Sequence, residues 1–442
     1  MIKITRKFIV GLVMFSPLFA MAQNATLDLS LDKAVEIALA ENPTIRVADK
    51  EIEIKKVADK EAWQALLPSV TADLALSHSI KVAAIKTAMG EFKMGMDGST
   101  TATGGLTMSL PLFAPAVYQN MKLTKEDIKL AQEKARASRL DLVNQITKAY
   151  YSALLAKDSR DVINKSYKLA EDNFNVVNSK FVNGRVSEYD KISAEVQMRT
   201  MKSSVVSAET GLNLALLQLK VLMGIDTDIN ININDSLKAY EDMLVLSNAQ
   251  ANEAELANNS TLKQLDQNKS MLQRARKVLR TGFMPTIGLQ LTGQYNSYSN
   301  NNWNIFNYKY SPSSTLAFAI SIPVFKANNW TKLQSNRIQL AQLDDTRENT
   351  YRQLSMAAQS YRDNMVKTIS KIESDREAVK QADKAVTIST KRYDVGRGTI
   401  LELNQSETAL VQAELAYHQS IYDFLQNKAD LDYTLGRGWQ KQ

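Results

Sequence analysis

The sequence predicts a mainly α-helical protein in which a few membrane β-strands are joined to long coiled-coil helices. Three features support this fold class: an export signal, an internal duplication, and four short strand patterns. The strand patterns come in two pairs, and an unusually long heptad pattern follows each pair. The strand patterns alternate apolar with small polar residues, as in a sheet with lipid on one face and water on the other.

The N-terminus contains the three parts of a secretory signal peptide in the expected order. Basic residues within positions 3–7 precede an apolar stretch at 8–20, and Ala20-Met21-Ala22 forms a small-residue cleavage site. The apolar stretch is too short to cross a bilayer as a helix. We therefore predict that residues 1–22 are removed and that the mature chain begins near Gln23.

The composition argues against several classes of protein. The 442 residues include no cysteine and only two histidines, His78 and His418, so thiolate metal sites and a cysteine nucleophile are excluded. We find no acid–base cluster and no metal-ligand spacing, and we expect neither an enzyme nor a bound cofactor. Loss of the signal lowers the net charge from +7 to +4, which gives no reason to expect nucleic acid as a partner.

Five short motifs recur in the same order at a nearly constant offset, 217 residues early in the repeat and 212 residues later. Such self-similarity is the sequence signature of a duplicated structural unit. The pairs are "ENPTI" at 41–45 and "NNSTL" at 258–262, "LLPSV" at 66–70 and "FMPTI" at 283–287, "SLPLF" at 109–113 and "SIPVF" at 321–325, "NGR" at 183–185 and "VGR" at 395–397, and "LMG" at 222–224 and "TLG" at 434–436.

The duplication predicts two structural repeats, at 23–228 and 249–442. Between them we expect a connector at 229–248 with one short strand, because Ile229, Ile231 and Ile233 alternate with asparagines. Each repeat should begin with a helix. The first runs from a Ser30 cap toward Leu67 and is broken or kinked at Asn42-Pro43, and the second runs from about 249 to 281.

Two strands of about ten residues follow each of these helices, at 69–78, 103–112, 286–295 and 315–324. Their polar faces are small or uncharged apart from Asp73, which suits a water-filled lumen, although a soluble sandwich alternates equally well. The loops between the paired strands are long. We expect four prolines to mark the junctions between the strands and the helices: Pro68, Pro111, Pro285 and Pro323.

Four strands are too few to form a membrane barrel, because the smallest such barrels have about eight. Open sheet edges in lipid would leave backbone groups without hydrogen bonds. The sequence also contains no later run of 18 apolar residues, so it predicts no membrane-spanning helix. If the strands span a membrane, the chain must therefore oligomerise to close the barrel.

The regions after the strands predict two helical hairpins, at 114–223 and 326–435. From Ile128 and from Tyr351, every seventh residue is apolar over seven or eight heptads, which is typical of coiled coils. About 50 such residues form a rod of roughly 75–80 Å. The hairpins should turn at Asn183-Gly184 and at 395–398, where glycine permits a positive φ.

With these features the chain resembles the TolC family of outer-membrane efflux proteins. The resemblance rests on the duplication, the strand borders "LPSV" and "SLPLF", the segment "VGRGTILELNQSE" and the terminal "LDYTLGRG". It implies a homotrimer in the outer membrane, with a 12-stranded β-barrel continued by a long periplasmic barrel of coiled-coil helices. It also implies an exit duct for an inner-membrane transporter, of the RND, ABC or a similar type, reached through a periplasmic adaptor protein.

The resemblance further implies that the hairpin tips close the pore. By position, Tyr393 and Asp190 match gate residues, and Glu402 matches the first of two acidic rings. The second acidic position holds Gln405, and the gate arginine falls on Gly398, one residue after Arg397. A link from Tyr393 or Arg397 to Asp190 would hold the gate shut. The tip residues expected to contact the adaptor are Gly184, Arg185, Gly396 and Gly398.

Two alternatives remain at this point. A passive porin would place many strands in one chain and would lack long helices. A soluble periplasmic coiled-coil scaffold would explain the heptads and would not explain the strands attached to one end of them.

Overall fold

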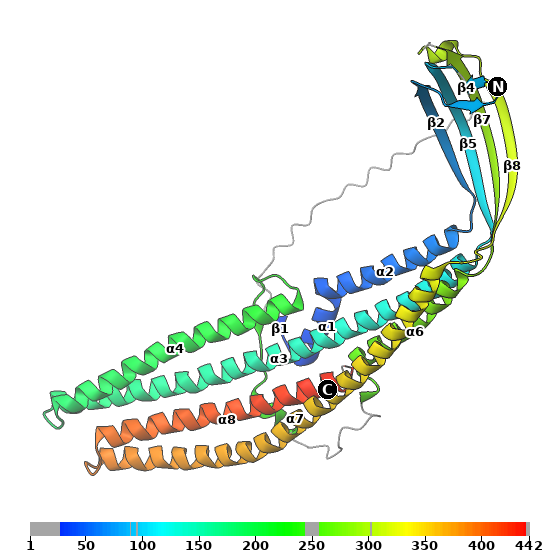
Figure 1. The fold of residues 1–442 in the computed structure, drawn as a ribbon. Coiled ribbons are helices and arrows are strands. Elements are labelled where there is room, and N and C mark those ends of the chain that lie inside the picture. Colours follow the sequence, from blue (N-terminus) through cyan, green and yellow to red (C-terminus); the bar gives the residue numbers. More distant parts are fainter. Residues whose placement is uncertain (1–26, 89, 94–95, 244–255, 301–302, 439–442) are drawn as a thin grey trace, which may run out of the picture.

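The computed structural model describes residues 27–88, 90–93, 96–243, 256–300 and 303–438. The predicted signal peptide, part of the connector and the predicted start of the second repeat near residue 249 lie outside these ranges. The described chain is elongated, with a β-sheet at one end and the turns of two helical hairpins at the other (Figure 1).

The sheet contains four antiparallel strands in the order β2-β5-β7-β8. The two repeats meet where β5 pairs with β7, and β2 and β8 are left as the two edges of the sheet. Along β8 the apolar side chains of Leu316, Phe318 and Ile320 are exposed. The bounds are Ser69–Ser79 for β2, Ser99–Phe113 for β5, Thr286–Asn300 for β7 and Ser311–Ser321 for β8.

The strands differ from the prediction at several of their ends, and β7 continues past its predicted end at 295 to Asn300. The ladder between β2 and β5 continues to Ser79 and Ser99, and the predicted loop at 79–102 contains a further hairpin of β3 (Ala84–Thr87) and β4 (Gly90–Lys93). β5 continues past Pro111, which lies beside a bulge, a position where a missing N–H is tolerated. β8 is shifted toward the N-terminus, so the predicted strand end at 322–324 was wrong.

The first helix of repeat one is broken at the position that the sequence predicted. α1 (Leu31–Glu41) and α2 (Pro43–Gln64) are separated by Asn42, whose extended backbone ends one helix and caps the next. Ser30 caps α1 as predicted, accepting a hydrogen bond from Lys33 N at 3.4 Å. The corresponding helix of repeat two, α6 (Ser260–Thr281), is capped by Asn259.

Two hairpins form the shaft: α3 (Pro115–Val182) with α4 (Glu188–Met223), and α7 (Ala327–Asp394) with α8 (Ile400–Thr434). α3 and α7 have 68 residues each, which corresponds to about 100 Å and is longer than predicted, because each helix begins directly after its strand. The predicted seam is buried at Ala135, Leu142, Ala170, Val177, Ala358, Met365, Ile372 and Val386.

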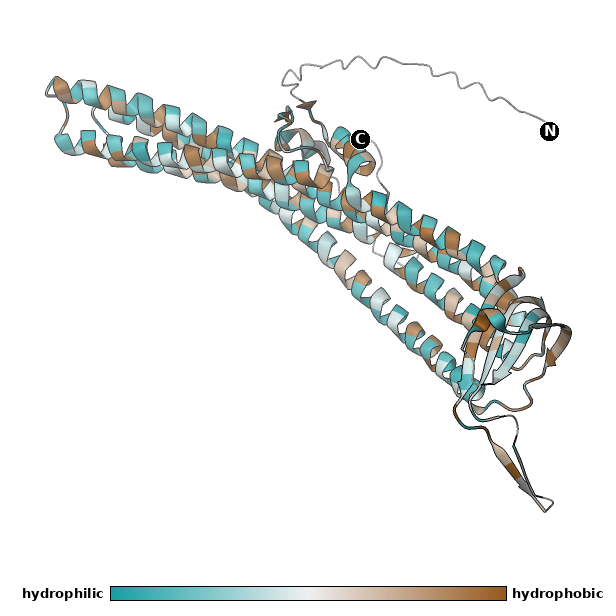
Figure 2. Ribbon diagram, turned by 90° about the horizontal axis from the view of Figure 1, so that it is seen from above, coloured by the Kyte–Doolittle hydropathy of each residue, from teal (hydrophilic) through white to brown (hydrophobic). Residues whose placement is uncertain are grey.

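The return helices α4 and α8 stop near the middle of the shaft (Figure 1). From there to the sheet, α2 packs beside α3 and α6 packs beside α7. The shaft therefore keeps four helices along its length: α3 and α7 continue, and halfway α2 and α6 take the places of α4 and α8. Polar and apolar residues alternate along all of these helices, as expected for helices that bury one narrow face (Figure 2).

The main hydrophobic core lies at this mid-length level, around Ile146, Tyr150, Leu154, Ile421 and Phe424. The connector closes over the core. Its strand β6 (Ile231–Asn232) pairs in parallel with β1 (Leu27–Asp28), and η1 (Leu237–Met243) packs against α3 and α8.

Polar contacts fasten the connector to the shaft. The Tyr150 hydroxyl donates to Asp235 at 2.6 Å, and buried Asp158 accepts from Leu237 N at 2.9 Å. Since these bonds involve buried groups, they fix the position of the connector on the core.

Candidate gate at the hairpin tips

The two tips have the same backbone geometry. Gly184 and Gly396 have φ of 67° and 73°, and a Cβ at either position would meet nothing within 4 Å. Arg185 N donates to Lys180 O and Arg397 N donates to Arg392 O, both at 2.8 Å, which completes a Schellman motif in each turn. The glycines are therefore required by backbone conformation and not by lack of space.

The predicted gate residues Asp190 and Glu402 occupy equivalent positions, three residues after the N-caps of α4 and α8. Ser187 and Asp190 form a reciprocal capping box, with Asp190 N donating to Ser187 Oγ at 3.2 Å. Glu402 N donates to Thr399 Oγ1, also at 3.2 Å. An acidic side chain at this position is stabilised by the helix N-terminus, which is a local reason for the charge at both tips.

Tyr393 lies at the end of α7, where the side chain is partly buried between the two hairpins. Burial raises the pKa of its phenol, and the nearby charges of Asp190 and Asp394 raise it further. The hydroxyl is shielded from solvent and has no hydrogen-bond partner among the described residues. Asp190 therefore lies near Tyr393, but no hydrogen bond forms the predicted link between them within this protomer.

Lys180, which the sequence analysis did not select, links the two tips. Its Nζ lies 3.4 Å from Asp394 Oδ1 and 4.9 Å from the centroid of the Tyr393 ring. Lys180 ends α3 and Asp394 ends α7, so this contact joins the two hairpins directly. The only sequence signal was a cation in the last turn of a helix, which is common at helix C-termini.

The predicted Arg397–Asp190 link is also absent within the described part of the protomer. Arg397 forms no ion pair there, whereas Arg392 Nη2 lies 3.5 Å from Glu402 Oε2 and 3.3 Å from the Arg397 carbonyl oxygen. Glu402 thus lies within ion-pair distance of an arginine of α7, across the turn of its own hairpin, but its Oε2 accepts no hydrogen bond from the described residues. Gln405 is exposed one turn further along α8.

A second residue missed from sequence, Glu407, is buried between the hairpins. Its side chain on α8 is 3% exposed and accepts a hydrogen bond from Asn173 of α3. Burial raises the pKa of this carboxyl to about 7, and the Asn173 amide opposes the shift. The signal was present in the sequence, since Leu403, Glu407 and Leu410 share one helical face.

Four buried apolar residues pack the tip below these polar groups: Val177, Ala194, Ile400 and Leu403. They come from α3, α4 and α8, so the tip has a small core of its own. It is separate from the large core at mid-length. A small core makes this end of the shaft easier to rearrange than the middle.

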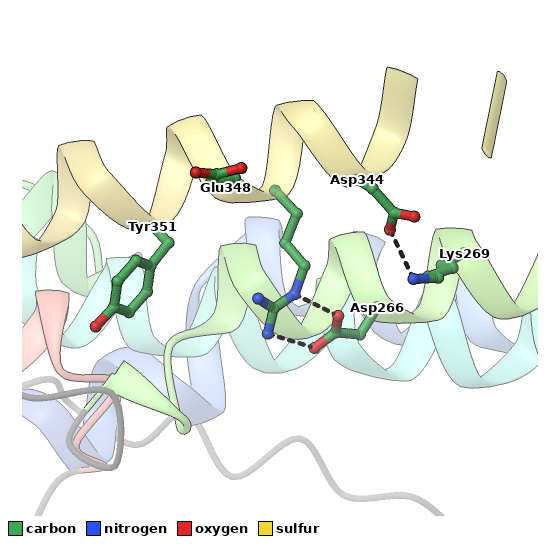
Figure 3. Close-up of a pocket in the computed structure, with 6 residues that line it drawn as sticks. Asp266, Lys269, Asp344, Glu348 and Tyr351 are labelled. Atoms are coloured by element: carbon green, nitrogen blue, oxygen red, sulfur yellow. Dashed lines mark hydrogen bonds and ion pairs between the residues drawn. The ribbon is translucent and has the colours of Figure 1, made fainter. Parts of the chain in front are cut away.

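The described residues contain no cluster of histidine, aspartate and glutamate side chains that could hold a metal ion. A groove between α6 and α7 is lined by oppositely charged pairs (Figure 3). Lys269 Nζ lies 2.6 Å from Asp344, and Arg347 Nε lies 2.7 Å from Asp266. Glu348, the third acidic residue that lines this groove, pairs with Arg352 of the same helix.

An antiparallel sheet with an exposed apolar face, carried by two hairpins about 100 Å long, is the arrangement expected of a membrane channel subunit. The family model of the outer membrane efflux protein matches residues 34–225 and 252–437, one stretch for each repeat. The chain therefore belongs to the outer membrane efflux protein family.

Individual relatives agree with this assignment. The alkaline protease secretion protein AprF of Pseudomonas aeruginosa is 23% identical over 92% of this chain and 84% of its own length. Outer membrane protein TolC of Escherichia coli is 21% identical over 92% of this chain and 82% of its own. The predicted resemblance and outer-membrane location are thus confirmed.

Solved structures confirm the fold class. The Campylobacter jejuni outer membrane channel CmeC has a TM-score of 0.72 at 17% identity, covering 92% of this chain and 85% of that one. CusC, whose structures concern transmembrane channel formation, has a TM-score of 0.74 at 17% identity and covers 95% and 96%.

Proposed function

We propose that the protein is the outer-membrane exit duct of a tripartite efflux or type I secretion system. The observation that carries this proposal is the sheet itself, whose two edges, β2 and β8, have no partner strand within the described chain. Such edges cannot face lipid, because their backbone groups would lack hydrogen bonds. Pairing β8 of one copy with β2 of the next removes every edge, and three copies give twelve strands.

The surface of α4 supports the same assembly. By length and composition alone, α4 is the one described helix that could cross a membrane, yet it lies in a hairpin on the shaft. Its exposed apolar residues are better explained by contact with a neighbouring protomer than by lipid. They include Ile192, Val196, Val206, Leu214 and Val221.

The partners follow from the family and remain part of the proposal. The tips would contact a periplasmic adaptor through Gly184, Arg185, Gly396 and Gly398, and the adaptor would connect the duct to an inner-membrane transporter. Glu402 and, one turn deeper, Gln405 would line the narrowest part of the pore. Carboxylates in a narrow ring favour cations and resist anions. This function involves no catalysis and no cofactor.

Membrane fractionation followed by single-channel recording of the purified protein tests the proposal. We expect the protein in the outer membrane as a heat-modifiable oligomer, with a small, cation-selective conductance in planar bilayers. Recovery in the soluble periplasmic fraction would favour the coiled-coil scaffold instead. A large, constantly open conductance that needs no adaptor for transport would favour the passive porin.

A further inference from the structure

One long stretch of the second repeat has charge of a single sign. Residues 267–343 contain nine lysines and arginines and no aspartate or glutamate. The matching stretch of the first repeat, residues 50–131, contains nine acidic residues among its basic ones. Both stretches run from a helix through two paired strands into a long helix, so this shared fold does not require the difference in charge.

Six of the nine basic residues gather where the shaft joins the sheet, at the end of α6 and the start of α7. Three contacts hold these two ends together. Asn329 Nδ2 donates to Gly282 O at 2.8 Å, Asn336 Nδ2 donates to Leu272 O at 3.1 Å, and the Phe283 ring lies 5.0 Å from Trp330. We call this set the basic collar: Arg276, Lys277, Arg280, Lys326, Lys332 and Arg337.

None of the collar residues forms an ion pair with another described residue, and Arg276 Nε is shielded from solvent without a hydrogen-bond acceptor. The contrast with the adjoining part of the same two helices is sharp. There Asp266 pairs with Arg347 and Asp344 with Lys269 (Figure 3). The pairing of charges therefore stops where the collar begins, and the collar repels itself unless an anionic partner covers it.

The surroundings of the collar indicate which partner that is. Exposed apolar residues continue from the end of β8 into the start of α7, among them Val324 at 94% and Trp330 at 63% exposure. The collar thus lies at the level where an apolar, lipid-facing surface gives way to a polar shaft. Tryptophan with lysine and arginine is the combination found at the headgroup level of membranes.

We propose that the basic collar binds the phosphate groups of anionic phospholipids in the periplasmic leaflet around the barrel. Arginine matches phosphate with paired N–H donors, and lysine adds a point charge. The bound lipids would stiffen the junction at which the sheet meets α6 and α7. The inference rests on the proposed membrane location of the sheet. The rival occupant is a neighbouring protomer, whose α2 offers exposed acidic residues at Glu53 and Glu61.

Native mass spectrometry of the full-length protein tests the inference, using detergent micelles with added phosphatidylglycerol or phosphatidylcholine. The test variant combines R280Q, K326Q and K332Q. The matched control combines K202Q, K367Q and K371Q, which remove three exposed lysines far from the junction. We expect wild type and control to retain phosphatidylglycerol over phosphatidylcholine, and the test variant to lose this preference by about tenfold or more.

Equal retention of phosphatidylglycerol by wild type and test variant would overturn the inference, as would equal retention of the two lipids by wild type. If the test variant keeps its lipid and instead falls apart into monomers, the neighbouring protomer is the occupant and the inference is also overturned. Conductance in a phosphatidylcholine bilayer separates this result from the proposed function. All three proteins should conduct there. Loss of conductance by wild type would contradict the proposed function as an exit duct and would leave the proposed lipid binding by the collar untouched.

Discussion

The Asn259 side chain joins the end of one helix to the start of another, donating from Nδ2 to the Thr434 carbonyl at 2.7 Å. Its Oδ1 accepts a hydrogen bond from Leu262 N at 3.1 Å. The first repeat builds the same joint, where Asn42 Nδ2 donates to Leu222 O at 2.7 Å and Asn42 Oδ1 accepts from Thr44 N. In each repeat a return helix therefore ends against the cap of the helix that replaces it in the shaft.

The glycine that follows each return helix makes this joint possible, so Gly436→Ala should disrupt it. Gly436 has φ of 65°, and a Cβ there would lie 2.1 Å from Asn258 O. Backbone must move to relieve that contact, and we expect a loss of more than about 2 kcal/mol of unfolding free energy.

Thermal unfolding followed by circular dichroism checks the prediction for Gly436. The matched control is Gly211→Ala, because Gly211 lies inside α4 with nothing within 4 Å of its Cβ position. There alanine should be neutral or stabilising by about 0.5–1 kcal/mol. Equal effects of the two substitutions on the free energy of unfolding would contradict the role of Gly436 in this joint.

The buried carboxyl of Glu407 should make the tip sensitive to pH. Its pKa is about 7 in the folded chain against 4.5 for an unperturbed glutamate, so between these values the folded state holds the proton more tightly. The contribution of Glu407 to the local free energy of unfolding is therefore complete below pH 4.5. It is lost as the pH rises through 7, which lowers that free energy by about 1–3 kcal/mol.

Hydrogen exchange of the amides near Glu407 at pH 6 and pH 8 measures this effect, after correction for intrinsic exchange. Glu407→Gln should remove the pH dependence of protection, because glutamine does not titrate. Glu209→Gln changes an exposed glutamate of α4 and should leave the pH dependence unchanged. A pH dependence that survives in Glu407→Gln would rule out this carboxyl as its source.

The proposed acidic ring at Glu402 predicts opposite results for two substitutions. Glu402→Gln should reduce the preference for cations over anions, and Gln405→Glu should increase it by adding charge one turn deeper. Reversal potentials in a salt gradient across a planar bilayer measure both. If neither variant changes the reversal potential, the two side chains do not face the narrowest part of the pore.

The Lys180–Asp394 contact predicts a variant that opens the gate without unfolding the protein. Both groups are partly exposed, so Lys180→Ala should change the unfolding free energy by less than about 1 kcal/mol. Because the contact joins the two hairpins, its loss should raise the probability that the pore is open.

Single-channel recording gives that probability directly. Lys191→Ala is the control, since Lys191 packs over Phe181 within the first hairpin and does not link the two. An open probability that rises equally in both variants would show a general loosening of the tips and would refute a specific link between the hairpins.

Much of this fold could be predicted because its signals are local and occur twice. The alternation at 286–295, the heptads from Ile128 and the glycine turn at Gly396 each depend on neighbouring residues. The shift of β8 was missed because Ile320, Ile322 and Val324 continue the alternation beyond Ser321, where the strand ends. The pattern alone cannot show where pairing with β7 stops.

The contacts of the candidate gate were harder to predict, for a physical reason. Lys180 and Asp394 are 214 residues apart, and their contact depends on how two long hairpins align. Family resemblance selected Asp190, Tyr393 and Glu402 as gate residues, and the structure places all three at the hairpin tips. It did not reveal that Asp190 and Glu402 are the third residues after the N-caps Ser187 and Thr399, with Asp190 completing a capping box.

Disulfide trapping between the sheet edges tests the central claim most directly, because the chain has no cysteine of its own. Thr71→Cys on β2 would be combined in turn with Ala317→Cys or Ala319→Cys on β8. These edges lie on opposite sides of the four-stranded sheet, so a bond within one chain is impossible. Closure of the barrel by three copies predicts a covalent trimer after oxidation of cells that carry the double variant. Monomers from every pairing, with the single variants as reference, would contradict closure of the barrel between chains.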